Sequence, residues 1–255
     1  MDQWAAIAKN YSIERDDVSL PALLIDKQMI ALADRRSRSK VFDYGAGSGT
    51  MARLLADLGH EVQCYEPTIE MVEVFRERTT VDRYPGIRLL TDMADLQPNA
   101  AYDTVICSNV VDHLLNVPAV LAQLRGLLLD EGHLLLSIPH PMKNRGTWVK
   151  DRRGDNWRYL YYRLDGYLNE GQVKRDREDM KGNVIIKDVV SQHRTISTYY
   201  NWIRDAGFSV HRMYEPAPPP EMATRYPELW EQSSRIAYFW ILDCTVAVDG
   251  LKQPG

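Results

Sequence analysis

The chain has 255 residues, 45% of them apolar and 26% charged, with a formal charge of −4. This length suits one large α/β domain, and an acidic balance without a long basic run argues against a dedicated nucleic-acid binder. The start does not resemble a signal peptide and no apolar run is long enough to span a membrane, so we expect a cytoplasmic protein with no membrane partner.

Residues 1–38 are predicted to form one or two helices that cap a sheet, with Pro21 beginning the second. Strand-length apolar segments then alternate with helical periods, which is the pattern of a parallel sheet covered on both faces. The expected strands are Lys40–Tyr44, Glu61–Glu66, Ile87–Leu90, Thr104–Ser108 and His133–Ile138. The expected helices lie near Thr50–Leu58, Thr68–Arg78 and Pro118–Leu129. Gly59 ends the first of these helices, as a left-handed C-terminal cap requires.

The pattern changes after Ile138, where Pro139-His140-Pro141 ends the fifth strand and an insertion covers residues 142–190. The run Gln172–Val190 predicts a β-hairpin around the turn Lys181-Gly182-Asn183. The insertion is dense in aromatic residues, namely Trp148, Trp157, Tyr159, Tyr161, Tyr162 and Tyr167. These rings fit a lid over an active site, and they fit equally a cluster that anchors the insertion or a contact with a second subunit.

The regular pattern resumes with a helix near Ser197–Ala206, closed by Gly207. Strands at Ser209–Tyr214 and Ala237–Val248 follow, separated by a long loop that contains Pro216-Ala217-Pro218-Pro219-Pro220. The whole chain, 1–255, is therefore predicted to be a single domain. Its fold class is α/β, with a doubly wound, mostly parallel seven-stranded sheet, a final antiparallel strand, an N-terminal helical cap and an insertion after strand five.

The cysteines lie inside apolar runs and show no paired or metal-type spacing. We interpret Cys64, Cys107 and Cys244 as buried reduced thiols, and we expect neither a metal site nor a disulfide framework.

A glycine-rich turn joins the first strand to the first helix after it, in the sequence Asp43-Tyr44-Gly45-Ala46-Gly47-Ser48-Gly49. Such a turn lets the backbone approach a ligand, and the helix that follows offers free N–H groups. A dinucleotide fingerprint is G-x-G-x-x-G, but here the third glycine comes one position early and an acid precedes the first. Asp43 would repel a pyrophosphate and suits a ligand that carries an amino group.

Glu66 ends the second strand, where a carboxylate can accept both hydroxyls of a ribose. An NAD site would use the same acid. Glu66 therefore indicates a ligand that contains adenosine, and the glycine spacing is the feature that distinguishes NAD from other such ligands.

These motifs resemble the class I S-adenosylmethionine-dependent methyltransferases, whose first motif, D/E-x-G-x-G-x-G, is matched by Asp43–Gly49. The segment Thr91–Leu96 resembles the family's third-strand motif, and Tyr102–Asn109 resembles its fourth. Leu127–His133 resembles the family's L-x-P-G-G turn, although acids replace the proline and one glycine. The resemblance covers residues 38–140 well and 190–248 moderately.

The resemblance implies S-adenosylmethionine as cofactor and S-adenosylhomocysteine as product. Asp92 would bond the adenine amino group, Met93 would lie against the ring, and the fourth-strand segment would pass the methionine part. The predicted cofactor-binding residues are Tyr11, Asp43, Gly45, Ala46, Gly47, Glu66, Pro67, Asp92, Met93, Ser108 and Asn109.

Three histidines are candidate catalytic residues at the carboxyl edge of the sheet or beside it: His113, His140 and His193. The pairs His140-Pro141 and His193-Arg194 resemble those of a bacterial small-molecule branch of the family. A base is needed only for hydroxyl, thiol or carbon acceptors, and any of the three histidines can equally be packing a loop.

The sequence thus predicts an enzyme that methylates a small-molecule acceptor, for example an aromatic or acidic metabolite, as a monomer or homodimer. The alternatives are an RNA or protein methyltransferase, a non-catalytic S-adenosylmethionine-binding module and an NAD-dependent oxidoreductase.

Overall fold

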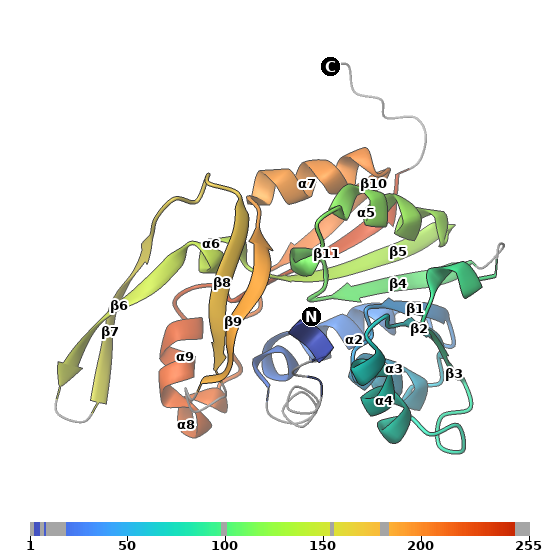
Figure 1. The fold of residues 1–255 in the computed structure, drawn as a ribbon, viewed down its shortest axis with the longest axis horizontal. Coiled ribbons are helices and arrows are strands. Elements are labelled where there is room, and N and C mark those ends of the chain that lie inside the picture. The colour runs from blue at the N-terminus through green and yellow to red at the C-terminus, as the bar shows by residue number, and fades with distance from the viewer. Residues whose placement is uncertain are drawn as a thin grey trace.

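The computed structural model describes residues 3–5, 8, 19–97, 101–153, 156–178 and 184–247. Within them, the main sheet has the strand order β10-β11-β5-β4-β1-β2-β3 (Figure 1). Its strands are β1 (Lys40–Tyr44), β2 (Glu61–Tyr65), β3 (Ile87–Leu90), β4 (Tyr102–Ser108), β5 (Leu128–Pro139), β10 (Phe208–Tyr214) and β11 (Phe239–Val246). The pairs from β3 through β5 are parallel, and β11 is antiparallel to both β5 and β10. The predicted mostly parallel sheet with a final antiparallel strand is confirmed.

Helices cover both faces of this sheet (Figure 1). The longer ones are η1 (Ala22–Asp26), α2 (Lys27–Ala33), α3 (Thr50–Asp57), α4 (Ile69–Arg78), α5 (Val117–Gly126) and α7 (Ile196–Asp205). Single turns form η2 (Met93–Asp95), η3 (Val111–His113) and α6 (Pro141–Asn144). Within the described part of the chain, no helix is both long enough and apolar enough to cross a bilayer.

Helix α5 is shorter than predicted, because it ends at Gly126 and β5 already begins at Leu128. The apolar run after Gly126 is compatible with either structure. Leu128 pairs with Tyr102 of β4, so sheet pairing rather than the local sequence sets this boundary.

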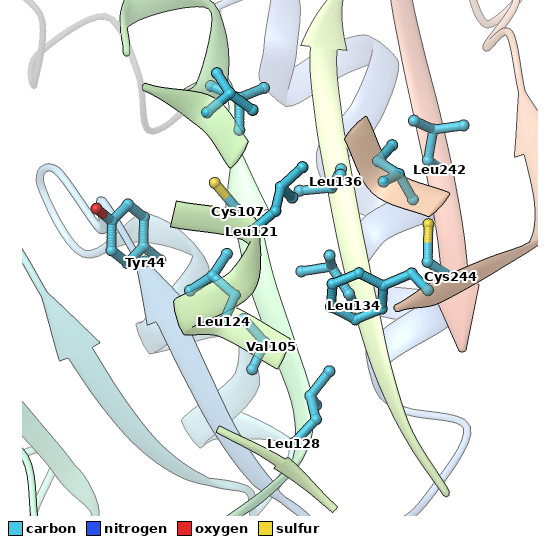
Figure 2. Close-up of a cluster of buried hydrophobic side chains, with 14 of the residues drawn as sticks. Tyr44, Val105, Cys107, Leu121, Leu124, Leu128, Leu134, Leu136, Leu242 and Cys244 are labelled. Carbon is cyan, nitrogen blue, oxygen red and sulfur yellow. The ribbon is translucent and has the colours of Figure 1, made fainter. Parts of the chain in front are cut away.

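The two faces of the sheet bury separate cores, because successive strand residues point to opposite faces. In β4, Val105 and Cys107 join the core under α5 and α7, whereas Ile106 joins the core under α2, α3 and α4. Figure 2 shows the first core, in which Leu121 and Leu124 of α5 lie over this face of the sheet. All three cysteines are buried and free, as predicted, and burial raises the pKa of their thiols above the ordinary value.

The insertion consists of two antiparallel hairpins and not of one. The predicted hairpin is confirmed as β8 (Gly171–Glu178) paired with β9 (Val184–His193), although its turn at 181–183 lies outside the described residues. The second hairpin, β6 (Gly146–Arg153) with β7 (Asn156–Leu164), was not predicted and projects from the body of the molecule (Figure 1). Its run of charges at Lys150–Arg153 hides the strand pattern in the sequence.

The predicted long loop between the last two strands is wrong, because it contains two short helices, α8 (Met222–Arg225) and α9 (Pro227–Ser233). Pro227 occupies the first turn of α9, a position that favours helix initiation. Both helices are too short to be stable alone. Contacts with the insertion hold them, including a hydrogen bond from Tyr159 Oη to Glu228 Oε2 at 3.0 Å.

A buried carboxylate joins the N-terminal cap to the sheet. Asp243 of β11 is fully buried, with Oδ2 2.6 Å from Arg35 Nη1 and Oδ1 3.0 Å from His133 Nδ1 of β5. Burial alone would raise the pKa of Asp243, but the hydrogen bonds and charges of His133 and Arg35 outweigh it and lower that pKa. The ionised carboxylate therefore stabilises the junction of cap and sheet.

Replacing Asp243 with Asn should lower the free energy of unfolding at neutral pH by about 1.5–3 kcal/mol, the usual contribution of hydrogen bonds to a charged group. Because the folded-state pKa of Asp243 lies below its unfolded value, its stabilisation is complete above about pH 4 and is lost as the pH falls through the folded-state pKa. Thermal melts of D243N should thus show a shallower loss of Tm in acid than the wild type. The exposed-site variant Asp82→Asn is the control, and equal acid slopes in D243N and the wild type would contradict the assignment.

Candidate functional site

The glycine turn between β1 and α3 is fastened to the end of β2. The N–H groups of Gly45 and Ala46 both donate to the carbonyl oxygen of Tyr65, at 2.8 and 3.0 Å. The N–H of Gly49 donates to the Ala46 carbonyl at 2.9 Å, which closes the turn before α3 begins. The turn is thereby fixed at the carboxyl edge of the sheet, where ligands of doubly wound folds bind.

The three glycines of the turn are required for different reasons. A Cβ on Gly45 would lie 2.5 Å from the Val110 side chain, and a Cβ on Gly49 would lie 2.7 Å from the Phe75 ring. A Cβ on Gly47 would have nothing within 4 Å, and the φ of Gly47 is +55°. The outer glycines allow protein to pack closely, whereas the middle one leaves open space in front of the backbone.

That space is a recess lined by Asp43, Gly45, Ala46, Gly47, Ser48, Thr50, Met51 and Ser108. The structure thus brings Asp43, the glycine loop and Ser108 together, and their role as cofactor ligands stays a prediction. Sequence reasoning did not name Ser48, Thr50 and Met51. The signal was available, because they lie at the start of α3, where helix N–H groups lack internal partners.

Glu66 braces the loop from the next strand. Its buried carboxylate accepts the N–H of Gly47 through Oε2 and the N–H of Thr68 through Oε1, each at 2.9 Å. Both carboxylate oxygens therefore take part in holding the glycine turn against the end of β2. Pro67 follows it and is exposed.

Asn109 follows β4 in a strained conformation. Its φ is +55°, which is uncommon for a residue other than glycine. Its N–H donates to the Ser137 carbonyl at 2.8 Å, and its buried Oδ1 finds no hydrogen-bond partner among the described residues. A strained backbone with an unsatisfied buried acceptor at this edge of the sheet is typical of a binding site.

Two further predicted cofactor residues, Asp92 and Met93, lie outside the recess. Asp92 is exposed at the end of β3 and accepts the N–H of Ala94 at 2.9 Å, while Met93 is half-buried beside it. Neither lines the recess, so their contact with an adenine stays a prediction. Tyr11 lies outside the described residues.

His113 joins η3 to the inserted hairpin. Its Nδ1 lies 3.0 Å from the carbonyl oxygen of Val190, and its Nε2 lies 3.6 Å from Asp112 Oδ2. Gln3 holds the same residue of β9, donating to Val190 O at 2.9 Å and accepting from Val190 N at 2.8 Å. The β8–β9 hairpin is therefore fastened against the carboxyl edge of β4.

His140 and His193 are both buried at the edges of the insertion. His140 accepts the N–H of Met142 through Nδ1 at 3.3 Å, and its Nε2 lies 3.0 Å from Glu215 Oε1. Burial lowers the pKa of His140, and Glu215 opposes that change. His193 Nε2 lies 2.8 Å from the carbonyl oxygen of Tyr167, and its Nδ1 has no partner among the described residues.

Part of the aromatic group in the insertion forms an anchoring cluster. The Trp148 ring lies 5.6 Å from that of Tyr159 and 5.2 Å from that of Tyr162, and the Arg235 guanidinium lies 4.8 Å from the Trp148 ring centre. Arg235 also donates to the Tyr159 carbonyl at 2.7 Å. These contacts match the anchoring alternative for these rings, whereas Trp157 and Tyr161 are exposed.

A family model described as a methyltransferase domain matches residues 19–213, which include the glycine turn and both inserted hairpins. A solved structure of an S-adenosylmethionine-dependent methyltransferase from Mesorhizobium loti superposes with a TM-score of 0.68 at 23% identity, covering 86% of this chain and 95% of that one. At that identity the likeness shows the fold.

Two curated relatives differ in what they act on. The tRNA U34 carboxymethyltransferase of Pasteurella multocida is 26% identical over 233 residues, 90% of this chain and 63% of that protein. The ubiquinone biosynthesis O-methyltransferase of Xanthomonas euvesicatoria pv. vesicatoria is 26% identical over 143 residues, 54% of this chain and 59% of that protein. The chain thus spans less than two thirds of either relative.

Replacing Glu66 with Gln should loosen the glycine turn, because an amide offers one acceptor oxygen where the carboxylate offers two. We expect the free energy of unfolding to fall by about 1–3 kcal/mol and the amides of Gly47 and Thr68 to exchange with solvent faster. Hydrogen exchange read by NMR measures both amides separately. The exposed helical variant Glu73→Gln serves as control, and unchanged protection of both amides in E66Q would refute the bracing role.

Proposed function

This chain belongs to the methyltransferase-domain family whose model matches residues 19–213, and on that premise we propose that it methylates a small molecule with S-adenosylmethionine as donor. S-adenosylhomocysteine is the product. The observation that carries the proposal is the recess between the glycine turn and the end of β4, with Asp43 at its wall.

The residues around the recess fit that cofactor. S-adenosylmethionine carries a cationic sulfonium and an ammonium, for which the buried acid Asp43 and the acceptor Oδ1 of Asn109 would be suitable partners. The empty Cβ position of Gly47 gives it room against the backbone. Glu66 would hold the ribose hydroxyls, and the resemblance assigns the adenine to Asp92 and Met93. When bound, the cofactor supplies an electrophilic methyl group.

The covering of the carboxyl edge favours a small acceptor. Val190 of β9 is bonded to both Gln3 and His113, so the inserted hairpin and an N-terminal residue lie over the end of β4. A covered edge suits an acceptor that can be enclosed, because methyl transfer benefits from aligned reactants and from the exclusion of water. In this proposal residues 142–190 act as a lid.

One feature favours tRNA as a second candidate acceptor, in line with the first relative. The β6–β7 hairpin exposes basic side chains, and the Nζ of Lys150 lies 4.4 Å from the ring centre of exposed Trp157. Basic groups interleaved with an aromatic ring can bind a phosphate backbone and stack on a base. The net charge of −4 weighs against this candidate.

Mass spectrometry after incubation with S-adenosylmethionine separates the two acceptor classes. Metabolite extracts and total tRNA are incubated separately with the protein, and we expect a mass increase of one methyl group in a metabolite. Methylated tRNA nucleosides without a methylated metabolite would overturn the small-molecule proposal. A variant with Lys150 and Trp157 both changed to Ala should retain metabolite methylation.

S-adenosylhomocysteine should bind with a one-to-one stoichiometry, and Gly47→Val should weaken it by roughly tenfold or more, about 1.4 kcal/mol. The valine fills the open space before the turn and strains a backbone with positive φ. Asp43→Ala should also weaken binding, since it removes the acid at the recess wall. Isothermal titration calorimetry measures all three proteins, with Gly126→Val as control because Gly126 lies on α5 and outside the recess. Affinity equal to wild type in both G47V and D43A would refute the cofactor site.

A further inference from the structure

Building on the proposed methyl transfer, we propose that His193 is the general base of the reaction and that the acceptor atom is the oxygen of an ionisable hydroxyl, as in a phenol. Two observations support this assignment. The first is the location of His193 at the covered edge, and the second is a ring nitrogen that its neighbours leave unused.

His193 lies at the acceptor side of the sheet. It is the last residue of β9, three positions after Val190, whose backbone is bonded to His113 at the end of β4. It also immediately precedes the Arg194-Thr195 start of α7, where Thr195 caps the helix. Helix α7 leads into β10, which runs parallel to β5 because both are antiparallel to β11. The start of α7 therefore lies at the carboxyl edge, and Figure 1 shows β9 ending beside it.

The hydrogen bond of His193 fixes which nitrogen carries its proton. Nε2 lies 2.8 Å from the carbonyl oxygen of Tyr167, which can only accept, so Nε2 must donate. In the neutral ring Nδ1 then carries the lone pair. Nδ1 is buried and has no partner among the described residues, although the whole side chain is enclosed. A buried acceptor without a donor costs free energy, and an acceptor hydroxyl would supply that donor.

The surroundings of His193 keep it neutral. Burial lowers its pKa below the ordinary value, and the guanidinium groups of Arg145 and Arg175 act in the same direction. The bond to Tyr167 and the charge of Glu170 oppose that change without reversing it. His193 is therefore a free base at neutral pH. The same cations would stabilise a negative charge that develops on an acceptor oxygen.

Arg145 also has a hydrogen-bond donor without a partner among the described residues. Its guanidinium donates through Nη2 to the carbonyl of Asn169, and its buried Nε has no partner among the described residues. The Arg145 Nε–H, which lacks a hydrogen-bond acceptor, thus lies in the same polar region as His193 Nδ1, which lacks a hydrogen-bond donor. An ionising hydroxyl can satisfy both, because its oxygen accepts and its proton is donated.

The other two candidate histidines face groups that fix their ring nitrogens. His140 accepts the N–H of Met142 through Nδ1, and its Nε2 lies 3.0 Å from the Glu215 carboxylate as an ion-pair contact that lacks hydrogen-bond geometry, so a carboxylate already faces that nitrogen. His113 directs Nδ1 at the Val190 carbonyl and Nε2 toward the Asp112 carboxylate. These contacts assign His140 and His113 to the structure of the loops.

The chemistry selects the class of acceptor. The acceptor O–H bond breaks and its proton passes to His193 Nδ1, while a new O–C bond forms to the methyl carbon. The C–S bond of the donor breaks with its electron pair on sulfur, which leaves neutral S-adenosylhomocysteine and an imidazolium. A phenol, with a pKa of about 10, yields its proton to imidazole far more readily than an aliphatic alcohol. An amine that is already neutral needs no such base.

The variant His193→Gln tests the assignment, because its amide can still donate to the Tyr167 carbonyl but carries no basic nitrogen. The probes are a panel of substituted phenols, primary alcohols and primary amines. In the wild type, kcat/KM for phenols should fall in acid as His193 becomes protonated. In H193Q, kcat/KM for phenols should no longer fall in acid, and the rate should be about 10²–10⁴-fold lower than in the wild type. The loss of rate should be smaller for more acidic phenols. His211→Gln, on the exposed side of β10, should match the wild type.

A readout without turnover comes from the ¹⁵N NMR signals of the histidine rings, assigned by their loss in H193Q. We expect His193 to hold its proton on Nε2 and to titrate below pH 6.5. A proton on Nδ1, an unchanged fall of kcat/KM in acid in H193Q, or methylation of amines and not of phenols would each overturn the proposal.

Calorimetry with S-adenosylhomocysteine distinguishes a failure of the His193 proposal from a failure of the proposed methyltransferase function. Normal binding in both the wild type and H193Q, combined with one of those contrary results, overturns only the assignment of the base and acceptor. Absence of binding in the wild type overturns the methyltransferase proposal itself.

Discussion

The turn from β1 into α3 is the constraint on which the site depends, because the backbone there is packed from both sides. Val110 occupies the space beside Gly45 and Phe75 the space beside Gly49, so neither position admits a side chain. Tyr65 O and Glu66 hold the turn from β2. Among the three glycines of the turn, Gly47 is the one in front of which the described residues leave open space. The packing of Val110 and Phe75 against the turn, together with its hydrogen bonds to the end of β2, thus fixes the shape of the recess. Asp43 lies at the wall of this recess.

The two halves of the site differ in charge, as the proposed reaction needs. The recess has the buried acid Asp43 at its wall and Glu66 behind the turn, and these acids complement a cationic donor, while the guanidinium of Arg53 binds the carbonyl oxygen of Ser48. Around His193 the charged groups are mainly the cations Arg145 and Arg175, which keep the imidazole neutral and favour a developing oxyanion. The donor half belongs to the sheet and its first turns, and the acceptor half belongs to the insertion. A change of acceptor can therefore evolve in the insertion without disturbing the donor site.

The insertion stays ordered although a two-stranded hairpin is at best marginally stable by itself. Trp148, Tyr159 and Arg235 join its first hairpin to α9 and to the segment between α9 and β11, and Val190 joins its second hairpin to η3 and Gln3. In the proposed function this second hairpin is the element that admits and releases the acceptor.

The sequence was enough to predict the sheet and the glycine turn of the proposed donor site. Long apolar strands and amphipathic helices are encoded by local periodicity, and the glycine turn with Asp43 and Glu66 is a local pattern whose place in a parallel sheet follows from topology. It did not reveal the β6–β7 hairpin or the helices α8 and α9, because these are stabilised by each other across the fold. Nor did it distinguish among His113, His140 and His193, because each is predicted at or beside the carboxyl edge of the sheet and any of them can equally pack a loop. Their surroundings differ in the folded structure, because the atoms nearest their ring nitrogens, such as Tyr167 O, Val190 O and Glu215 Oε1, come from segments that folding brings together.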